Sequence, residues 1–449
     1  MPRSFDSIPS PRELPVLGSF HRRFGSPLPF FRELKRDHGD AARFTIFNER
    51  LVLFNDPAIV NEFLVTKGAS FRKGRALESA RLFLGNSLLV SEGDEHTRQR
   101  RLLQPAFHRG RIAGYARVMA RRAREWSDGR RDGEEIDLAL EMNRLTLAVV
   151  GETLFGSAVE GEAHEIAESL TVIIENFQRM FLPFWSVIRH VPVPANLRLR
   201  RAQRRLDETI YALIAKRRRE GGDQGDLLSM LLAAEDADDP RRRLSDTEVR
   251  DQAMTLFIAG HETTANALAW TWHLLAHHEP VRAKLKAEID AVLGPDRLPE
   301  LEDAARLPFT TAVFSEAMRL YPPVWVIGRR ALEDVTLGDY EIPARTIVLG
   351  SQYLLHRDER FWPRAEEFLP ERWLDEAAAE GRPKFTYFPF GGGARICIGD
   401  GFAWAEGVLM LAVMARRWRM ESVPGHPVEM NPTVTLRPKH GLKMVVHAA

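Results

Sequence analysis

Residues 388–401 read FPFGGGARICIGDG, and this stretch holds Cys397, the only cysteine in a chain of 449 residues. A lone cysteine is most often a small buried apolar residue. The three glycines before it argue for more, because a backbone without side chains can lie flat against a large planar group. A dinucleotide-binding loop would need glycine at position 396, where the sequence has Ile396, and no βαβ pattern surrounds the stretch.

The thiol also stands just before a predicted helix, residues 402–418 (FAWAEGVLMLAVMARRW). A sulfur near the free N–H groups of a helix amino terminus is stabilised as the thiolate, which is the form that binds metals. No second cysteine is present to complete a zinc or iron–sulfur cluster or an internal disulfide. A single axial bond from Cys397 to a haem iron is therefore the use that these residues favour.

Composition excludes some broad classes. With 63 basic and 62 acidic residues the net charge is +1, so no global attraction to nucleic acid or to acidic lipid is expected. Residues 1–20 are polar and proline-rich and lack the apolar run of a signal peptide or a membrane span. We expect a cytoplasmic protein with no nucleic-acid partner and no membrane anchor.

Helices dominate the predicted structure. Apolar spacing predicts helices at 56–68, 110–128, 136–156, 161–180, 198–219 and 402–418. Strands are predicted at 43–47 and 51–54, which form a hairpin, at 335–337, 340–342 and 346–351, and in a last hairpin of 433–438 with 442–447. Many helices with few scattered strands indicate a fold that is mainly α with small β-sheets.

The longest predicted helix covers residues 246–278. It opens with the capping-box sequence SDTE at 245–248, and Pro280 lies just beyond its end. At ~1.5 Å per residue such a helix is about 50 Å long. Its middle, residues 255–270, is apolar around one polar island, which predicts burial on nearly all sides.

That polar island reads AGHETT, residues 259–264. The zinc-protease motif HExxH is absent, because position 265 is alanine. One interpretation is structural: Gly260 permits close helix packing, and the polar groups satisfy neighbouring backbone. However, Gly260 costs ~1 kcal/mol of helix propensity relative to alanine, and buried Glu262 and Thr263 need hydrogen-bond partners. We favour a locally opened helix with a place for a small ligand and a route for protons.

A second polar pattern is SEAMR, residues 315–319. Glu316 and Arg319 share one helix face, and such a pair is usually a solvated surface salt bridge of little energetic value. Arg372, in the later stretch FLPERW (368–373), is a candidate third member that would turn the pair into a charge network.

Together these motifs resemble those of the cytochrome P450 family, the haem-thiolate monooxygenases, over nearly the entire chain. The family's cysteine-loop pattern FxxGxRxCxG is matched by Phe390, Gly393, Arg395, Cys397 and Gly399. Its ExxR pair and downstream arginine are matched by Glu316, Arg319 and Arg372, and its oxygen-binding helix pattern by Ala259, Gly260, Glu262 and Thr263. The motifs occur in the family's order with ordinary spacing.

The resemblance implies a fold and a set of cofactor contacts. It implies a single triangular domain, 1–449, with residues 1–70 and 335–360 in a small β-rich part and 71–334 and 361–420 in a helical haem-binding core. It implies haem b, with Cys397 as the iron ligand. The further haem-binding residues that it implies are Phe390, Gly391, Arg395, Gly399, Ala259, His96, Arg100 and Arg329. Of these, His96, Arg100, Arg329 and Arg395 are expected to meet the propionates, as charged donors suit carboxylates.

The resemblance also implies the reaction. Thr263 would hydrogen-bond the oxygen at the cofactor, Glu262 would help to relay protons, and the product would be a hydroxylated or epoxidised apolar molecule. The electrons would come from a ferredoxin or flavodoxin with its NAD(P)H-dependent reductase, and the enzyme would be a monomer. We expect a basic surface to receive that acidic partner. Its expected members are Arg98, Arg101, Lys384, Arg416 and Arg417.

The substrate pocket is expected around residues 76–90, 177–185, the central helix and the turn after Pro323. The candidate lining residues are Leu82, Phe83, Leu88, Phe177, Phe181, Phe184, Phe257, Val326 and Ile327. Such a lining suits a fatty acid, a terpenoid or a steroid, although several of these residues could simply pack the core. Two alternatives to a monooxygenase are an H2O2-dependent peroxygenase and a non-enzymatic haem-thiolate sensor.

Overall fold

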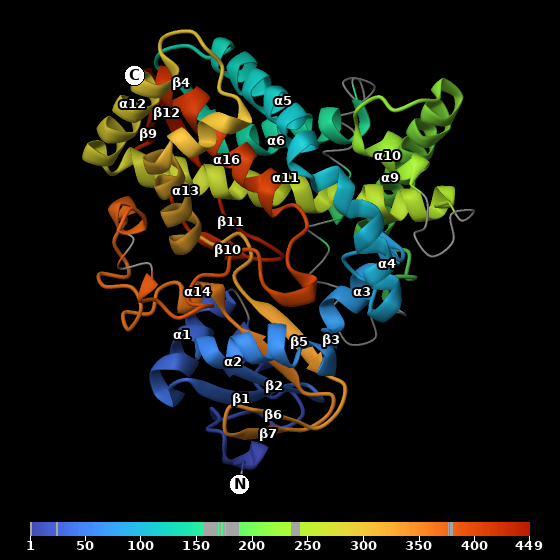
Figure 1. Cartoon of the computed structure of the whole chain (residues 1–449). Helices are drawn as coiled ribbons and strands as arrows, with labels where there is room; N and C mark the ends of the chain where they lie inside the picture. The colour runs from blue at the N-terminus through green and yellow to red at the C-terminus, as the bar shows by residue number, and fades with distance from the viewer. Residues whose placement is uncertain are drawn as a thin grey trace. The chain divides into compact units, whose positions relative to one another are not determined.

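A computed structural model describes residues 2–23, 26–156, 169, 172–173, 176, 188–234, 243–375, 377 and 380–449 (Figure 1). Its contacts divide the chain into two units. Unit 1 comprises Met1–Arg75, Ser315–Cys397 and Glu429–Lys439, and unit 2 comprises Ala76–Phe314, Ile398–Val428 and His440–Ala449. The predicted mainly α fold with small β-sheets is confirmed, while the single domain with its sequence-based internal division stays a prediction.

Unit 1 is built on a mixed sheet of five strands in the order β1-β2-β8-β5-β3. The elements of unit 1 are α1 (Pro27–His38), β1 (Ala41–Ile46), β2 (Glu49–Phe54), α2 (Pro57–Asn61) with a π-helical turn (Glu62–Thr66), β3 (Phe71–Lys73), β5 (Ile327–Ala331), β6 (Val335–Leu337), β7 (Tyr340–Ile342), β8 (Ile347–Gly350), α14 (Gln352–Leu355), β10 (Met430–Pro432) and β11 (Leu436–Pro438). The β1–β2 hairpin is the one predicted from sequence, and β2 pairs in parallel with β8. Phe54, Phe63 and Val348 are fully buried in one of the two cores of this unit.

The end of the chain differs from the prediction. Residues 433–438 and 442–447 do not form a hairpin with each other: β11 pairs with β10, whereas β12 (Lys443–Ala448) pairs with β4 (Glu134–Asp137) and β9 (Trp418–Ser422). The reason is visible in β12, where Met444 and Val446 are fully buried and so need a sheet that covers one face. Sequence alternation identified the strand but not its neighbours.

Unit 2 is helical. Its elements besides β4, β9 and β12 are α3 (Arg75–Leu84), α4 (Gly93–Leu103), α5 (Arg109–Asp128), α6 (Leu138–Phe155), α9 (Pro194–Glu220), α10 (Leu227–Ala233), α11 (Asp246–Ala276), α12 (Glu279–Leu293), α13 (Pro308–Leu320, whose second half lies in unit 1) and α16 (Asp400–Arg417). The predicted helix at 161–180 lies almost wholly outside the described residues. Among the described residues, no helix is both long enough and apolar enough to cross a membrane.

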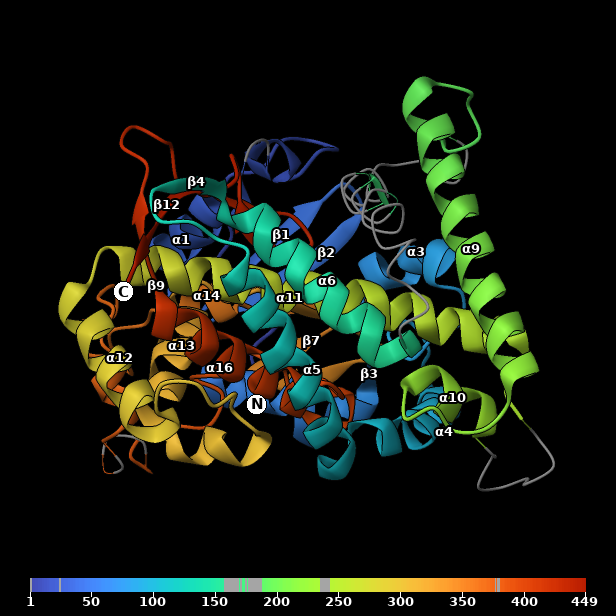
Figure 2. The ribbon, with the colours of Figure 1, turned by 90° about the horizontal axis from the view of Figure 1, so that it is seen from above.

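Helix α11 is the central element of unit 2. Its 31 residues begin with the predicted capping box, in which Ser245 and Glu248 satisfy each other's backbone N–H groups. It packs along α6 and against α16, and Figure 2 shows α9 crossing its amino-terminal end. There Arg250 of α11 donates from Nε to Asp207 of α9 at 2.8 Å. The helix stops at Ala276, and Pro280 lies in the first turn of α12.

Candidate functional site

The cysteine loop of unit 1 depends on its glycines. Gly391 and Gly393 have φ angles of +75° and +69°, which side-chain-bearing residues rarely adopt. A Cβ on Gly393 would lie 2.0 Å from the carbonyl oxygen of Leu64. The N–H of Cys397 donates to the carbonyl of Phe390 at 3.0 Å, and Cys397 is exposed. The loop is thus a closed backbone structure that presents one thiol at its surface.

Arg395 has partners in the same unit. Its Nη1 and Nη2 donate to the carbonyls of Gly68 and Phe71 at 3.2 and 2.9 Å. The guanidinium therefore ties the cysteine loop to the start of β3 and the turn before it. A propionate contact by Arg395 stays a prediction.

Arg329 lies opposite a residue that the sequence did not single out. In the antiparallel pair β3–β5, Lys73 is directly across from Arg329, so the two side chains share one face of the sheet. They are only 6% and 5% exposed. Two buried cations side by side favour an anionic group nearby. Nothing in the local sequence FRKG marks Lys73, because its importance comes from the register of a distant strand.

The ExxR residues form a buried network. Glu316 and Arg319 are both 0% exposed, so the solvated surface alternative does not hold. Arg319 donates to Glu316 from Nε and Nη2 at 2.8 Å each, and Arg372 Nε donates at 3.0 Å. Trp373 Nε1 and the backbone N–H of Leu369 complete five donors on one carboxylate. This carboxylate is fully paired, the condition under which burial of a charge is tolerated.

Arg319 also reaches three backbone carbonyls. It donates to the carbonyls of His356 at 2.7 Å, Ala365 at 2.6 Å and Glu367 at 3.1 Å. The pair therefore does more than join two turns of α13. It supplies hydrogen bonds to a segment that has little regular secondary structure.

Helix α11 carries the acid–alcohol pair in unit 2. From Val249 to Leu275 every residue is buried except Ile258, Ala259, Gly260, Thr263 and His273. The first four form one exposed window in the middle of a buried helix. The hydroxyl of Thr263 donates to the carbonyl of Ala259 at 2.8 Å, and Glu262 is buried.

The predicted local opening of this helix is wrong: α11 is α-helical throughout residues 246–276. Gly260 serves close packing, since a Cβ there would lie 3.2 Å from Cγ2 of Val150 on α6. A second contact joins the same two helices one residue farther along α11, where the hydroxyl of Thr146 of α6 donates to the carbonyl of His261 at 3.0 Å. Burial lowers the pKa of His261, whose Nδ1 lies 2.6 Å from the carbonyl oxygen of Phe257.

His96 and Arg100 share one face of α4, four residues apart. His96 is buried and Arg100 is partly exposed. The face of α4 that carries both residues is therefore at least partly shielded from solvent. Gly399, the remaining predicted contact, precedes α16 as its N-cap residue.

The predicted pocket residues fall into three groups. Phe177, Phe181 and Phe184 lie outside the described residues. Phe83, Leu88 and Phe257 belong to the hydrophobic core of unit 2, and Phe257 stacks on Phe155 at 4.4 Å. Leu82 is 42% exposed, and Val326 and Ile327 are partly buried against the cores of unit 1. The structure thus gives three of the candidates a packing role.

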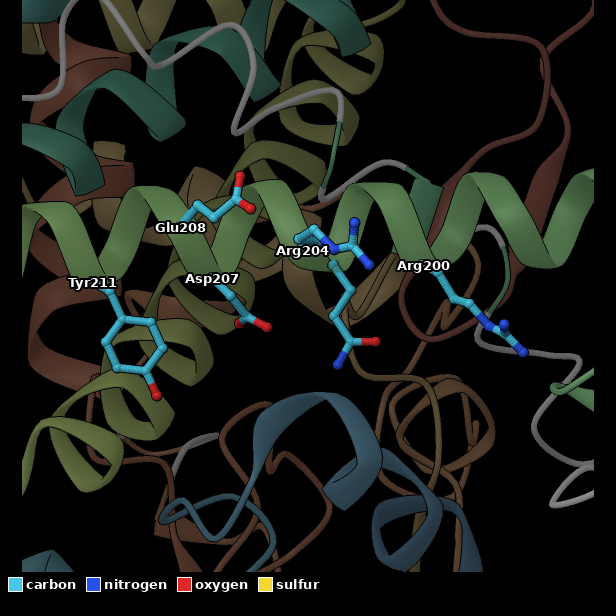
Figure 3. A pocket seen from close by; sticks show the side chains of 6 residues that line it. Arg200, Arg204, Asp207, Glu208 and Tyr211 are labelled. Carbon is cyan, nitrogen blue, oxygen red and sulfur yellow. The ribbon is translucent and has the colours of Figure 1, made fainter.

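A groove of about 600 Å³ lies on α9 (Figure 3). It is lined by Arg200, Gln203, Arg204, Asp207, Glu208 and Tyr211. Two of these residues are committed to neighbouring helices: Gln203 donates to the carbonyl of Leu82 on α3, and Asp207 pairs with Arg250. None of the residues predicted from the sequence lines this groove, so we assign no catalytic role to it.

One expected member of the basic docking surface is wrong, because Arg416 is buried, and the other four stay predictions. Arg98 is ion-paired with Glu95 and Glu248 at 2.8 Å each, Arg417 is paired with Asp128, and buried Arg416 donates to the carbonyls of Gly294 and Arg297. Charges that are already paired contribute little to the attraction of a distant acidic protein. Arg101 and Lys384 are exposed.

The residues present fit a haem. Unit 1 offers an exposed thiol on a glycine-rich loop together with the buried Arg329–Lys73 pair, whose charge suits carboxylates. Unit 2 offers the exposed window around Ala259, where a small side chain leaves room for a flat ligand.

Comparisons with known proteins agree with these features. Residues 8–445 match the family model described as cytochrome P450. The chain is 40% identical to cyclooctatin synthase of Streptomyces melanosporofaciens, covering 95% of this chain and 93% of that protein. It is 37% identical to cyclooctat-9-en-7-ol 5-monooxygenase of the same organism, over 93% and 90% of the two chains. It is 36% identical to pentalenene oxygenase of Streptomyces avermitilis, over 92% and 91%.

Solved structures are similar over the same length. A cyanobacterial CYP120A1 with bound retinoic acid superimposes with a TM-score of 0.88 at 26% identity, covering 98% of this chain and 99% of that one. The haem domain of cytochrome P450DA gives a TM-score of 0.87 at 27% identity, covering 100% and 98%.

Proposed function

The chain belongs to the cytochrome P450 family, and from that premise we propose that Cys397 is its iron ligand and that it oxidises a hydrophobic, cyclic terpenoid. The chain is a monooxygenase with haem b as its cofactor. When bound, the haem supplies the oxidising chemistry, placing one atom of dioxygen on the substrate while the other leaves as water after two electrons and two protons arrive.

The observation that carries the iron-ligand assignment is the cysteine loop. Its backbone is closed by the Cys397–Phe390 hydrogen bond, and Gly393 fits against Leu64 so tightly that a larger residue would force the backbone to move. We infer that these contacts hold the loop in one shape, and it presents the single thiol of the chain outward. Rigid presentation of a ligand is what a metal site requires.

The geometry of Thr263 suggests its part in the reaction. Its hydroxyl proton is committed to the carbonyl of Ala259, so its oxygen presents lone pairs and accepts a hydrogen bond from a protonated reactant. Buried Glu262, one residue earlier, is the carboxyl that passes protons inward. Ala259 keeps this part of the window open.

We propose that the propionates are held by Arg329 and Lys73, with His96, Arg100 and Arg395 as further donors. The register supports this assignment, because it places two buried cationic side chains on one face of the sheet, and positive charge suits the two carboxylates of a haem. Lys73 extends the set of residues expected from the sequence.

The substrate class rests on the relatives. Their names include an oxygenase of pentalenene and a monooxygenase of cyclooctat-9-en-7-ol, both cyclic and largely apolar compounds. The redox partner that we propose is a ferredoxin or flavodoxin with its NAD(P)H-dependent reductase, as bacterial members of the family use separate partners. The monomeric state and the cytoplasmic location stay predictions.

Replacing Thr263 tests the reaction. With surrogate redox partners and a panel of cyclic terpenes, Thr263→Ala is expected to keep oxidising NAD(P)H while product falls at least ~10-fold and peroxide accumulates. Thr263→Ser should restore much of the coupling.

Thr271→Ala is a matched control, because Thr271 donates in the same way to the carbonyl of Ala267 at 2.7 Å, two turns farther along α11. Equal coupling in Thr263→Ala and wild type would contradict the role of the hydroxyl. An unchanged haem-thiolate spectrum in Cys397→Ser would contradict the ligand assignment.

A further inference from the structure

His356 is a fully buried histidine that contacts two parts of unit 1. It caps the carboxyl end of α14, and its own carbonyl accepts a hydrogen bond from Arg319 at 2.7 Å. On the other side of the residue, ring atom Nε2 accepts the backbone N–H of Phe388 at 3.0 Å. One side chain thus lies between the buried ion pair and the first residue of the cysteine loop.

The hydrogen bond from Phe388 defines the state of the ring. An N–H donor needs an acceptor, so Nε2 carries no proton and the neutral ring has its proton on Nδ1. Backbone groups of Met318 and Arg319 favour a proton on the ring, although Nδ1 makes no well-formed hydrogen bond with a described residue.

The charges around the ring oppose a second proton. Burial, then the cations Arg319 and Arg357, hold the pKa of His356 well below its usual value. Tyr387, whose ring centroid lies 4.9 Å from that of His356, is held neutral by burial, which raises its pKa far above the usual range. The carboxylate of the network, Glu316, already accepts hydrogen bonds from five donors.

Backbone hydrogen bonds also join Phe388 and the residues after it to the backbone of Cys397. The carbonyl of Phe388 accepts the N–H of Gly391 at 3.0 Å, and the carbonyl of Phe390 accepts the N–H of Cys397 at 3.0 Å. Tyr387, the residue before Phe388, is also held: its hydroxyl donates to the carbonyl of Ser315, next to Glu316, at 3.1 Å. The start of the loop is therefore fastened to the charge network through two consecutive residues.

We propose that His356 is a positioning residue for Cys397: by accepting the N–H of Phe388, it transmits the rigidity of the Glu316–Arg319–Arg372 network to the loop that presents the thiolate. This inference rests on the proposed iron ligand. It concerns how the thiol is held rather than what it binds, so the two can fail separately.

Two substitutions separate the acceptor from the packing. His356→Phe keeps a ring of similar size against Tyr387 and Phe388 but offers no acceptor, whereas His356→Gln keeps a carbonyl oxygen at about the reach of Nε2. His190→Phe, at an exposed histidine, is the control.

The readout is hydrogen exchange of the haem-loaded enzyme, followed at the amide of Phe388. We expect exchange to be faster by roughly tenfold in His356→Phe, close to wild type in His356→Gln, and unchanged in the control. The thiolate-ligated fraction of the carbon monoxide complex should fall in His356→Phe alone. Wild-type exchange of Phe388 in His356→Phe would overturn the proposal.

A measurement on the wild-type enzyme covers the case in which His356→Phe does not fold. Nitrogen-15 NMR of labelled histidines in the diamagnetic carbon monoxide complex should show His356 as the neutral ring protonated at Nδ1. A ring protonated at Nε2, or a doubly protonated ring at neutral pH, would overturn the proposal. If Cys397→Ser left the thiolate spectrum intact while Phe388 still depended on His356, the ligand assignment alone would have failed.

Discussion

The buried carboxyl of Glu406 on α16 allows a quantitative prediction of how the free energy of unfolding depends on pH. The side chain is 0% exposed, and neither carboxyl oxygen makes a well-formed hydrogen bond with a described residue. Burial raises the pKa of Glu406 from 4.5 to about 8, and the hydroxyl of Thr264 on α11 acts weakly in the opposite direction. At neutral pH the residue is therefore a neutral acid between two helices of unit 2.

The substitution Glu406→Gln removes the ionisation and keeps the shape. In the folded protein the carboxyl holds its proton up to pH of about 8, while in the unfolded chain it loses the proton above 4.5. The unfolded state therefore gains stability from ionisation as the pH rises between these values, and the folded state does not. At about 1.4 kcal/mol for each pH unit, the cost to folding approaches about 3 kcal/mol at pH 7 and about 5 kcal/mol above pH 8.

Urea unfolding of the haem-loaded enzyme, followed by tryptophan fluorescence at pH 5.5, 6.5, 7.5 and 8.5, measures this term. We expect the stability of Glu406→Gln, relative to wild type, to rise by about 1.4 kcal/mol for each pH unit up to pH of about 8 and then to level off. Glu302→Gln, at an exposed glutamate, should leave the pH dependence unchanged. A difference between Glu406→Gln and wild type that does not vary with pH would refute the reasoning.

Two further substitutions test the charge network and the docking surface. Glu316→Gln should destabilise the haem-loaded enzyme by about 3–5 kcal/mol in thermal unfolding, because Arg319 and Arg372 lose their buried carboxylate. Glu371→Gln, exposed in the adjacent turn, should cost less than ~0.5 kcal/mol, and equal effects would contradict the network. Arg101→Glu, at an exposed arginine, should slow reduction by an acidic ferredoxin several-fold at low ionic strength, whereas Arg101→Lys, which keeps the charge, should not. Reduction rates that ignore both salt and Arg101→Glu would argue against an electrostatically guided partner.

The sequence was most informative where the chemistry is local. The cysteine loop, the ExxR pair and the capping box of α11 each lie within about ten consecutive residues, so the spacing of residue types was enough to identify them. The β1–β2 hairpin belongs to the same class. In each case the interacting groups are neighbours along the chain, and geometry follows from helix or turn periodicity.

Features that depend on distant segments could not be predicted. Lys73 is important only because β3 lies against β5, and β12 joined β4 and β9 rather than the strand before it. Arg416 resembled a surface charge until the structure placed it against two carbonyls. The raised pKa of Glu406 is likewise due to burial, which depends on how α16 packs against the helices around it. These are consequences of tertiary packing, which spacing does not encode.

The hydrogen bonds from Arg319 to the carbonyls of His356, Ala365 and Glu367 have a consequence for the order of folding events. The segment has short local turns, such as the N–H of Phe361 to the carbonyl of Asp358 at 3.0 Å, and the three bonds from Arg319 help to offset the conformational entropy that it loses on ordering. Residues 356–369 should therefore become ordered together with the second half of α13. Because the ring of His356 also accepts the N–H of Phe388, we expect the cysteine loop to acquire its shape after that docking step and the cofactor to bind late in the maturation of the polypeptide.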